Sequence, residues 1–206
     1  MNIPQYLHRG DSDSKQVRKL RETINHYQLQ TNLINLGNGR EIKEKPLIDL
    51  INKHVAEGNS KTSFLSFTEV ENIAFRFGMN CELNEVEEKK ESYFDYYEEQ
   101  YDWDFVITTI DTSKINISKI DNGLYYGDFT PSLEIYKNCG FYLYLINVVE
   151  FFTNIEGFEI AYDLAKGDKE WLILPATNII NDSISNEYSA IIDGGCIHKI
   201  RKYKKY

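Results

Sequence analysis

The sequence predicts an α+β protein made of one domain over residues 1–206. Helical spacing of apolar residues is concentrated in the first half of the chain, whereas runs rich in β-branched and aromatic residues dominate after Phe105. Helices and strands that are segregated along a chain are typical of the α+β class. A chain of 206 residues, 42% of them hydrophobic, can bury a substantial core, and no repeat or low-complexity linker divides it.

The first third of the chain predicts one strand and two helices. Residues 5–10 form a short strand candidate that Gly10 ends. A helix is expected over residues 13–27, because apolar side chains recur there at helical spacing. A second helix is expected from Pro46, since proline is favoured in a first helical turn, and Gly58 is expected to end it.

Residues 62–78 predict a strand followed by a helix. Thr68 and Glu71 have the spacing of a capping box at the start of this helix, and Gly78 suits its end. Residues 82–104 then carry ten acidic and two basic residues, interleaved with aromatic ones. We expect a solvated amphipathic helix here; the alternative is an acidic surface for a basic partner such as an antitoxin.

The second half of the chain predicts mainly strands. A strand is expected over residues 105–110, a long one over 141–152, and another after Glu170 that Pro175 closes. A short helix over 155–165 is expected to stop at Gly167. Residues 188–192 and 196–200 flank Asp193-Gly194-Gly195 as a predicted hairpin, and residues 198–206 are interpreted as a frayed, basic tail.

Composition excludes several classes of function. A net charge of −9 argues against a generic nucleic-acid or membrane binder. No stretch is long and apolar enough to span a bilayer, and no signal peptide is visible, so a cytoplasmic location is expected. The three cysteines, Cys81, Cys139 and Cys196, form no ligand cluster with histidine, and no metal site is expected.

Asp168 and Glu170 form a carboxylate pair at the start of an apolar strand. Residues two apart in a strand project from the same face, so the two carboxylates are expected to point into one site. Like charges at this distance oppose each other's ionisation. Such a pair serves a ligand, serves chemistry, or lies in water.

Three motifs in order suggest a family. They are Leu7-His8-Arg9-Gly10, then Phe64-Leu65-Ser66-Phe67-Thr68, then Asp168-Lys169-Glu170 before an apolar strand. This order resembles the ADP-ribosyltransferase superfamily, in the branch marked by arginine, Ser-Thr-Ser and Glu-x-Glu. The resemblance spans nearly the whole chain, and it implies a split, mixed β-sheet with flanking helices and NAD bound as substrate in the cleft between the two halves of the sheet.

The resemblance implies roles for the motif residues. Arg9 would bind a phosphate of NAD through its planar cation, and the backbone of Gly10 would hold the nicotinamide amide. Ser66 would fix the catalytic Glu170 and the nicotinamide ribose. Glu170 would accept a hydrogen bond from the ribose 2′-hydroxyl and favour the oxocarbenium-like charge that develops as nicotinamide leaves.

Two further cofactor-binding candidates are less specific. Thr68 is fully explained by a capping role, although it stands at the third position of the Ser-Thr-Ser motif. Phe75 or Phe77 is a candidate to stack on nicotinamide, and Phe77 is the one we select; core packing is expected of at least one of them. Phe67 replaces the family's central threonine, whose side chain would point away from the site.

Asp168 departs from the family, which has glutamate or glutamine two residues before the catalytic one. An aspartate can still orient or deprotonate the incoming nucleophile, but the acceptor stays open between a protein side chain, a nucleic-acid base and water. The resemblance suits a toxin of a toxin–antitoxin or antiviral defence system with an antitoxin or immunity protein, and an injected effector is the alternative. A non-catalytic NAD-binding module is the remaining alternative, with Phe67 and Asp168 as marks of decay.

Overall fold

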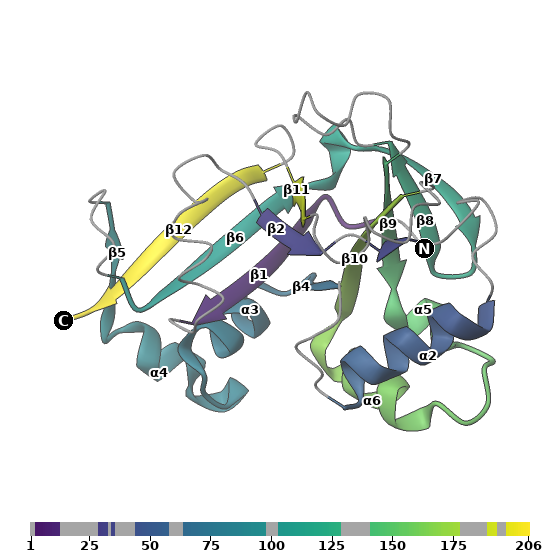
Figure 1. Ribbon diagram of the computed structural model, residues 1–206. Helices are drawn as coiled ribbons and strands as arrows, with labels where there is room; N and C mark the ends of the chain where they lie inside the picture. The colour runs from purple at the N-terminus through teal and green to yellow at the C-terminus, as the bar shows by residue number, and fades with distance from the viewer. Residues whose placement is uncertain are drawn as a thin grey trace. The chain divides into compact units, whose positions relative to one another are not determined.

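The computed structural model describes residues 3–12, 29–32, 34–35, 44–57, 64–97, 103–128, 141–177, 189–192 and 197–206 (Figure 1). It combines a large antiparallel β-sheet with several helices, so the mixed α and β composition predicted from the sequence is confirmed. Contacts between Cα atoms separate two compact units, each built from several chain segments. The first unit comprises Met1–Leu29, Phe67–Lys114 and Ile192–Tyr206, and the second comprises Gln30–Ser66 and Ile115–Ile191. The expectation of one domain stays a prediction.

The first unit is an antiparallel sheet whose strands follow the order β5-β12-β6-β1-β4 (Figure 1). The last two residues of β4 belong to this unit. Arg9 of β1 lies opposite Thr108 of β6, which fixes which side chains share a face. The strands are β1 (Tyr6–Ser12), β4 (Leu65–Thr68), β5 (Tyr93–Tyr96), β6 (Phe105–Asp111) and β12 (Ile197–Lys205).

Helices cover one face of this sheet. The helices of the unit are α3 (Glu71–Met79) and α4 (Val86–Lys90), with short 3₁₀ turns η1 (Leu83–Glu85) and η2 (Thr112–Lys114). The core between α3 and the sheet is aromatic: Phe75 packs edge-on against Tyr203 at 5.1 Å, and Phe105 stacks on Tyr203 at 4.8 Å between ring centroids. Burial of these rings is the main force that holds α3 on the sheet.

Two sequence predictions in the first unit are wrong. Residues 82–104 do not form one amphipathic helix, because Tyr93–Tyr96 pairs with β12 as strand β5. Residues 198–206 are not a frayed tail; they fill β12, between β5 and β6. Tyr203 is buried against Phe105, while the lysines around it remain partly or fully exposed, so one face of the strand contributes to the core.

The ends of α3 also differ from the sequence prediction. The helix is capped at Val70 without a side-chain bond, while the Thr68 hydroxyl accepts from the Val70 amide at 3.1 Å. Glu71 pairs instead with Arg201, so the capping box is not formed. Gly78 lies within the last turn rather than after it, and the helix ends at Met79, followed by Asn80 as a C-cap with a left-handed φ of 51°.

The second unit is built on strands in the order β10-β9-β8-β7, all antiparallel, with β3 parallel to β10. The strands are β3 (Ile34–Asn35), β7 (Asn116–Asp121), β8 (Leu124–Asp128), β9 (Phe141–Asn147) and β10 (Glu170–Thr177). A separate two-stranded sheet pairs β2 (Leu29–Asn32) with β11 (Ser189–Ile192). The helices α2 (Glu44–Val55), α5 (Val148–Phe152) and α6 (Glu159–Asp168) contribute to one apolar core with the strands.

Three sequence predictions in the second half of the chain are wrong. The strand predicted over 141–152 ends at Asn147, whose side chain accepts from the amide of Glu150 and starts α5. The helix predicted over 155–165 continues through Gly167 to Asp168. The predicted hairpin of 188–192 and 196–200 is not formed in the described part of the chain, because β11 pairs with β2 and β12 pairs with β5 and β6.

Some predictions lie outside the described residues. These are the helix over 13–27, the turn at 193–195, and the surroundings of Cys139 and Cys196. Within the described ranges, no helix is long and apolar enough to cross a membrane.

Candidate active site

Glu170 stands at a sharp change of direction in the second unit. Helix α6 ends at Asp168, Lys169 adopts a left-handed backbone with φ 49°, and Glu170 begins β10. The next residue, Trp171, is 1% exposed, and it pairs with Asn147 across β9 and β10. The buried strand therefore anchors the backbone of Glu170, while its side chain remains partly accessible.

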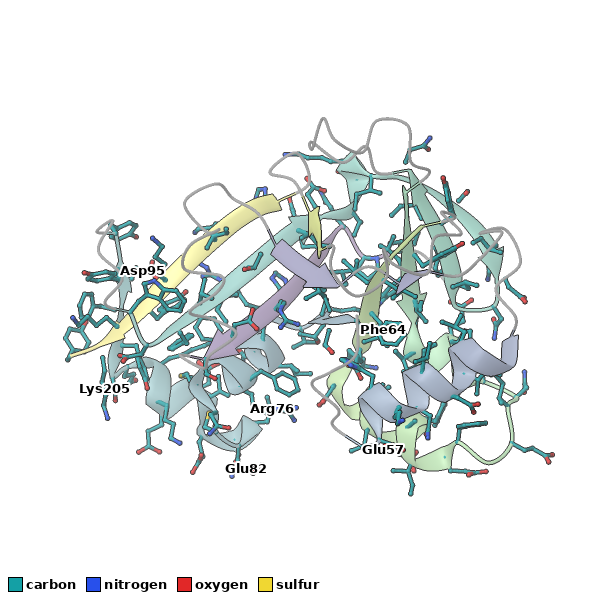
Figure 2. The ribbon with its side chains drawn as sticks, in the orientation of Figure 1. Glu57, Phe64, Arg76, Glu82, Asp95 and Lys205 are labelled. Atoms are coloured by element: carbon teal, nitrogen blue, oxygen red, sulfur yellow. The ribbon has the colours of Figure 1, made fainter. Side chains whose placement is uncertain are left out.

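The carboxyl group of Glu170 is hydrogen-bonded to the side chain of Ser66 on β4. The same serine Oγ lies 2.7 Å from Nε2 of His54, near the end of α2. The His54 ring packs edge-on against Phe64, labelled in Figure 2, at 5.4 Å between centroids. Side chains from three elements, α2, β4 and β10, thus converge at one hydroxyl group.

The hydrogen-bonding capacity of serine fixes the direction of this network. A serine hydroxyl has a single proton, so when it donates to an ionised Glu170 it can only accept from His54. The Nε2 atom of His54 then carries a proton in that state. When Glu170 is protonated, the carboxylic acid can donate to Ser66 and the hydroxyl can turn to His54. The hydrogen bonds among Glu170, Ser66 and His54 can therefore form in either charge state of Glu170.

Burial raises the pKa of Glu170 to about 7. The hydrogen bond from Ser66 acts in the opposite direction, because it favours the ionised carboxylate, and the charge of Asp168 raises the pKa further. A carboxyl group that titrates near neutrality in a partly accessible position is a candidate for acid–base or electrostatic chemistry.

Asp168 does not share a strand face with Glu170, which corrects the sequence prediction. It is the last residue of α6, and the left-handed Lys169 separates the two carboxylates. Asp168 is partly buried and close enough to Glu170 to influence its charge. The two carboxylates are therefore electrostatic neighbours that come from different elements.

The remaining predicted residues belong to the first unit. Arg9 forms a two-bond ion pair with Asp11: Nε donates to Oδ2 at 2.8 Å and Nη2 donates to Oδ1 at 2.6 Å. Asp11 is only 7% exposed, so the pair lies in a region of reduced screening. Asp11 occupies the Nε–Nη2 edge of the guanidinium, which is an edge through which arginine can hold a phosphate with two parallel bonds.

Gly10 has a packing role that the sequence did not reveal. A Cβ atom at this position would lie 1.8 Å from the carbonyl oxygen of Ala74 and 2.7 Å from the amide nitrogen of Gly78, both in the backbone of α3. Glycine is therefore required for the close approach of strand β1 to helix α3. Contact between its backbone and a ligand stays a prediction.

Thr68 and Phe77 differ in accessibility. Thr68 is buried and, as described above, its hydroxyl accepts from the backbone two residues ahead. Phe77 is 48% exposed on α3, with the guanidinium of Arg76, labelled in Figure 2, 4.2 Å from its ring centroid. Phe75 is buried in the core, which confirms the expectation of core packing for one of the two phenylalanines.

The structure brings together Ser66 and Glu170 with Asp168 nearby in the second unit, and it assigns Arg9, Gly10, Thr68 and Phe77 to the first. His54 is the residue that sequence reasoning missed. Its only sequence signal is a ring-bearing polar residue near the end of a predicted helix, which does not by itself indicate contact with Ser66.

Within the described ranges, no group of three or more histidine, cysteine, aspartate or glutamate residues is arranged to hold a metal ion. Comparison of the chain with protein-family models, with curated proteins and with solved structures finds no significant match. The functional assignment therefore depends on the residues themselves.

Proposed function

We propose that the protein is a mono-ADP-ribosyltransferase, which transfers ADP-ribose from NAD to a macromolecular acceptor and releases nicotinamide. The observation that carries the proposal is the hydrogen bond between Ser66 and Glu170, two residues that the motif order pairs although they are 104 positions apart. The raised pKa of Glu170 supports it, because this environment distinguishes Glu170 from an ordinary surface glutamate.

Glu170 acts in this reaction as a carboxylate. It accepts a hydrogen bond from the 2′-hydroxyl of the nicotinamide ribose and stabilises positive charge on the ribose as the bond between C1′ and the nicotinamide nitrogen breaks. The electron pair of that bond leaves with nicotinamide, which departs as a neutral molecule and needs no general acid. The acceptor atom then forms its bond to C1′ and releases its proton, for which Asp168 is the neighbouring base.

Ser66 and His54 act by positioning. The Ser66 hydroxyl holds the carboxylate of Glu170 and offsets part of the effect of burial, which otherwise favours the protonated form. His54 orients that hydroxyl through a contact of 2.7 Å. Loss of either side chain is expected to lower the fraction of Glu170 that is ionised and correctly oriented at neutral pH.

Arg9 is the proposed phosphate ligand, held in place by Asp11. A phosphate can take the place of Asp11 or bind a different edge of the guanidinium, since the planar group carries five N–H donors. The two-bond contact with Asp11 fixes the orientation of the guanidinium, so that less conformational freedom is lost when an anion binds.

The proposal is tested with NAD labelled in its adenylate phosphate, which stays in the ADP-ribose group. The protein is incubated with labelled NAD and cell extract, and label is measured separately in protein, RNA, DNA and free ADP-ribose. Label in a macromolecular fraction that is lost with Glu170→Gln supports the proposal and names the acceptor class. Glu57→Gln is the matched control, because Glu57 is an exposed glutamate of the second unit (Figure 2).

The other outcomes are equally informative. Free ADP-ribose without label in macromolecules would indicate an NAD glycohydrolase with water as the acceptor. Consumption of NAD that is unchanged in Glu170→Gln would contradict the assignment of Glu170. Absence of NAD consumption in every extract would refute the enzyme proposal and favour a non-catalytic module.

A toxin acting in the cytoplasm of the producing cell is the biological role that we attach to this activity. Unrestrained transfer depletes NAD or modifies macromolecules of that cell. Induced expression of the wild type in a bacterial host is therefore expected to lower the count of viable cells, and Glu170→Gln is expected to relieve the effect. Equal toxicity of the wild type and Glu170→Gln at equal expression would contradict this role.

A further inference from the structure

The outer face of β5 and β12 carries two aromatic and two basic side chains. Tyr96 lies opposite Lys202, and Phe94 lies opposite Lys204, in the antiparallel register of the two strands. Side chains two apart in a strand share a face, so all four project from the same side of the sheet. The aromatic–lysine face is defined by Phe94, Tyr96, Lys202 and Lys204.

The opposite side of the same strands is the buried one. Tyr93 and Tyr203 alternate with the residues of the aromatic–lysine face, and both pack against Phe105 in the core beneath α3. The aromatic residues of β5 are thus sorted into an inner ring that fills the core and outer rings that do not. All four residues of the aromatic–lysine face are partly exposed. Core packing therefore does not account for this face.

The outer rings form a short row. The ring centroids of Phe94 and Tyr96 are 6.3 Å apart, and the ring of Tyr206 lies 5.2 Å from Phe94. Tyr206 is 84% exposed, and its backbone amide donates to the carbonyl of Ser92 at 3.1 Å, which holds the C-terminal residue beside β5. The ammonium group of Lys204 lies 5.5 Å from the centroid of Tyr96. Flat rings and cations alternate over this surface.

Strand β12 is strongly basic in a protein of net charge −9. Residues 197–206 contain five basic residues and no acidic residue. Asp95 alternates with Phe94 and Tyr96 in β5 and so projects to the other side of the strand, where its carboxylate is hydrogen-bonded to the hydroxyl of Tyr203. Asp104, next to Trp103, accepts from the backbone amide of Lys205 at 2.7 Å. Asp95 and Asp104 therefore have partners away from the aromatic–lysine face.

We propose that the aromatic–lysine face binds single-stranded nucleic acid. Every base presents a flat π-face to an aromatic ring, and lysine neutralises the phosphates, so rings interleaved with cations on an open sheet suit an unpaired strand. A duplex keeps its bases stacked on each other and cannot use the rings. Because the net charge of the whole protein is negative, long-range attraction is weak and binding depends on these close contacts.

This surface lies in the first unit, and its binding requires neither NAD nor Glu170. The proposal therefore goes beyond the transfer reaction and can fail or succeed independently of it. If both proposals hold, the bound strand is the first candidate for the macromolecular acceptor.

Fluorescence anisotropy with labelled oligonucleotides tests the proposal. The probes are RNA and DNA single strands of mixed sequence, about 20 nucleotides long so that they exceed the site, and the corresponding DNA duplex. The wild type is expected to bind at least one single strand more tightly than the duplex, with affinity that falls as salt rises above about 50 mM. The comparison of RNA with DNA identifies which strand is preferred.

Two double variants separate stacking from charge. Phe94→Ala with Tyr96→Ala is expected to weaken binding by about tenfold or more while leaving the salt dependence unchanged. Lys202→Gln with Lys204→Gln is expected to lower the slope of log affinity against log salt by about 1.4, since each phosphate contact with a single strand contributes about 0.7.

Controls match each change elsewhere on the surface. Tyr97→Ala removes an aromatic ring that is 87% exposed and lies next to, but outside, the face. Lys114→Gln with Lys166→Gln makes the same change in net charge at two exposed lysines. Circular dichroism confirms that each variant is folded; if either face variant is not, the single substitutions Tyr96→Leu and Lys202→Gln replace it.

The result that would overturn the proposal is absence of binding to every single strand at about 50 mM salt. Binding that the control variants weaken as much as the face variants would also overturn it. Equal binding of duplex and single strand, with no effect of the aromatic substitutions, would show only a generic attraction for polyanions. If Glu170→Gln binds single strands as tightly as the wild type does, binding at this surface is independent of the proposed reaction.

Discussion

Replacement of Glu170 by glutamine is expected to stabilise the protein in mildly alkaline solution and to change its stability little in acid. Burial raises the pKa of this carboxyl group from 4.5 to about 7. Between these two values the folded protein binds a proton that the unfolded chain has released. The free energy of unfolding therefore falls as pH rises through this window, because stability rises with pH only where the unfolded state binds more protons.

The size of the effect follows from the shift in pKa. A difference of about 2.5 units corresponds to roughly 3 kcal/mol, which is the stability lost when Glu170 must ionise in its partly buried position. Glutamine keeps the shape and a hydrogen-bonding oxygen but cannot ionise. The variant is therefore expected to gain up to about 3 kcal/mol over the wild type near pH 8, and almost nothing near pH 4.

Urea denaturation monitored by tryptophan fluorescence measures this difference. The chain has two tryptophans: Trp171 follows Glu170 directly in β10, and Trp103 lies in the first unit. A Trp103→Phe background leaves Trp171 as a reporter of the second unit. Stability is compared at several pH values for the parent, Glu170→Gln and Glu57→Gln, which changes an exposed glutamate. A stability difference between parent and Glu170→Gln that does not vary with pH would refute the reasoning.

Three further substitutions test other parts of the argument. Gly10→Ala is expected to destabilise the protein by about 3 kcal/mol, because the new Cβ would collide with the backbone of α3. A melting temperature close to that of the wild type would contradict this. Arg9→Ala is expected to destabilise the protein by about 2 kcal/mol, because it leaves Asp11 buried and unpaired. The double variant Arg9→Ala with Asp11→Ala is expected to recover part of this loss, and urea titration of both variants measures the difference. Ser66→Ala is expected to move the pH midpoint of NAD consumption upward, since its hydrogen bond favours the ionised form of Glu170; a fixed midpoint would show that the bond does not influence the charge.

The strands that carry the candidate site were predictable where their sequence is dense in apolar and β-branched residues. Strand β6 begins at the expected Phe105, and β10 lies in the expected place, although it includes Glu170 and continues past Pro175 to Thr177. Strand β12 was missed because its lysines suggested a solvated tail, while Tyr203 supplies the buried side of the strand. The sequence of one β-strand with a polar face cannot be distinguished from that of a solvated tail until the neighbouring strands in the sheet are known.

The relation between Asp168 and Glu170 was not predictable from spacing. A glycine is the usual residue in the left-handed position at a helix end, so Gly167 was expected to stop α6. The helix instead continues past Gly167, and Lys169 takes the left-handed conformation with φ 49°. A shift of the boundary by two residues moved Asp168 from the strand to the helix. The contact between His54 and Ser66 was equally hidden, because it depends on how α2 packs.

The charge state of Glu170 links stability to the proposed reaction. Burial favours the protonated carboxyl group, whereas the proposed chemistry requires the carboxylate. The hydrogen bond from Ser66, which also contacts His54, lowers the pKa of Glu170 and so favours the form that the reaction needs. If one group controls both properties, NAD consumption must rise with a midpoint near pH 7, which is the pH at which the fall in stability levels off. If the midpoint of activity and the pH at which stability levels off coincide in the wild type and move together in Ser66→Ala, Glu170 is the common group. If they move separately, the pH dependence of the reaction belongs to a different residue.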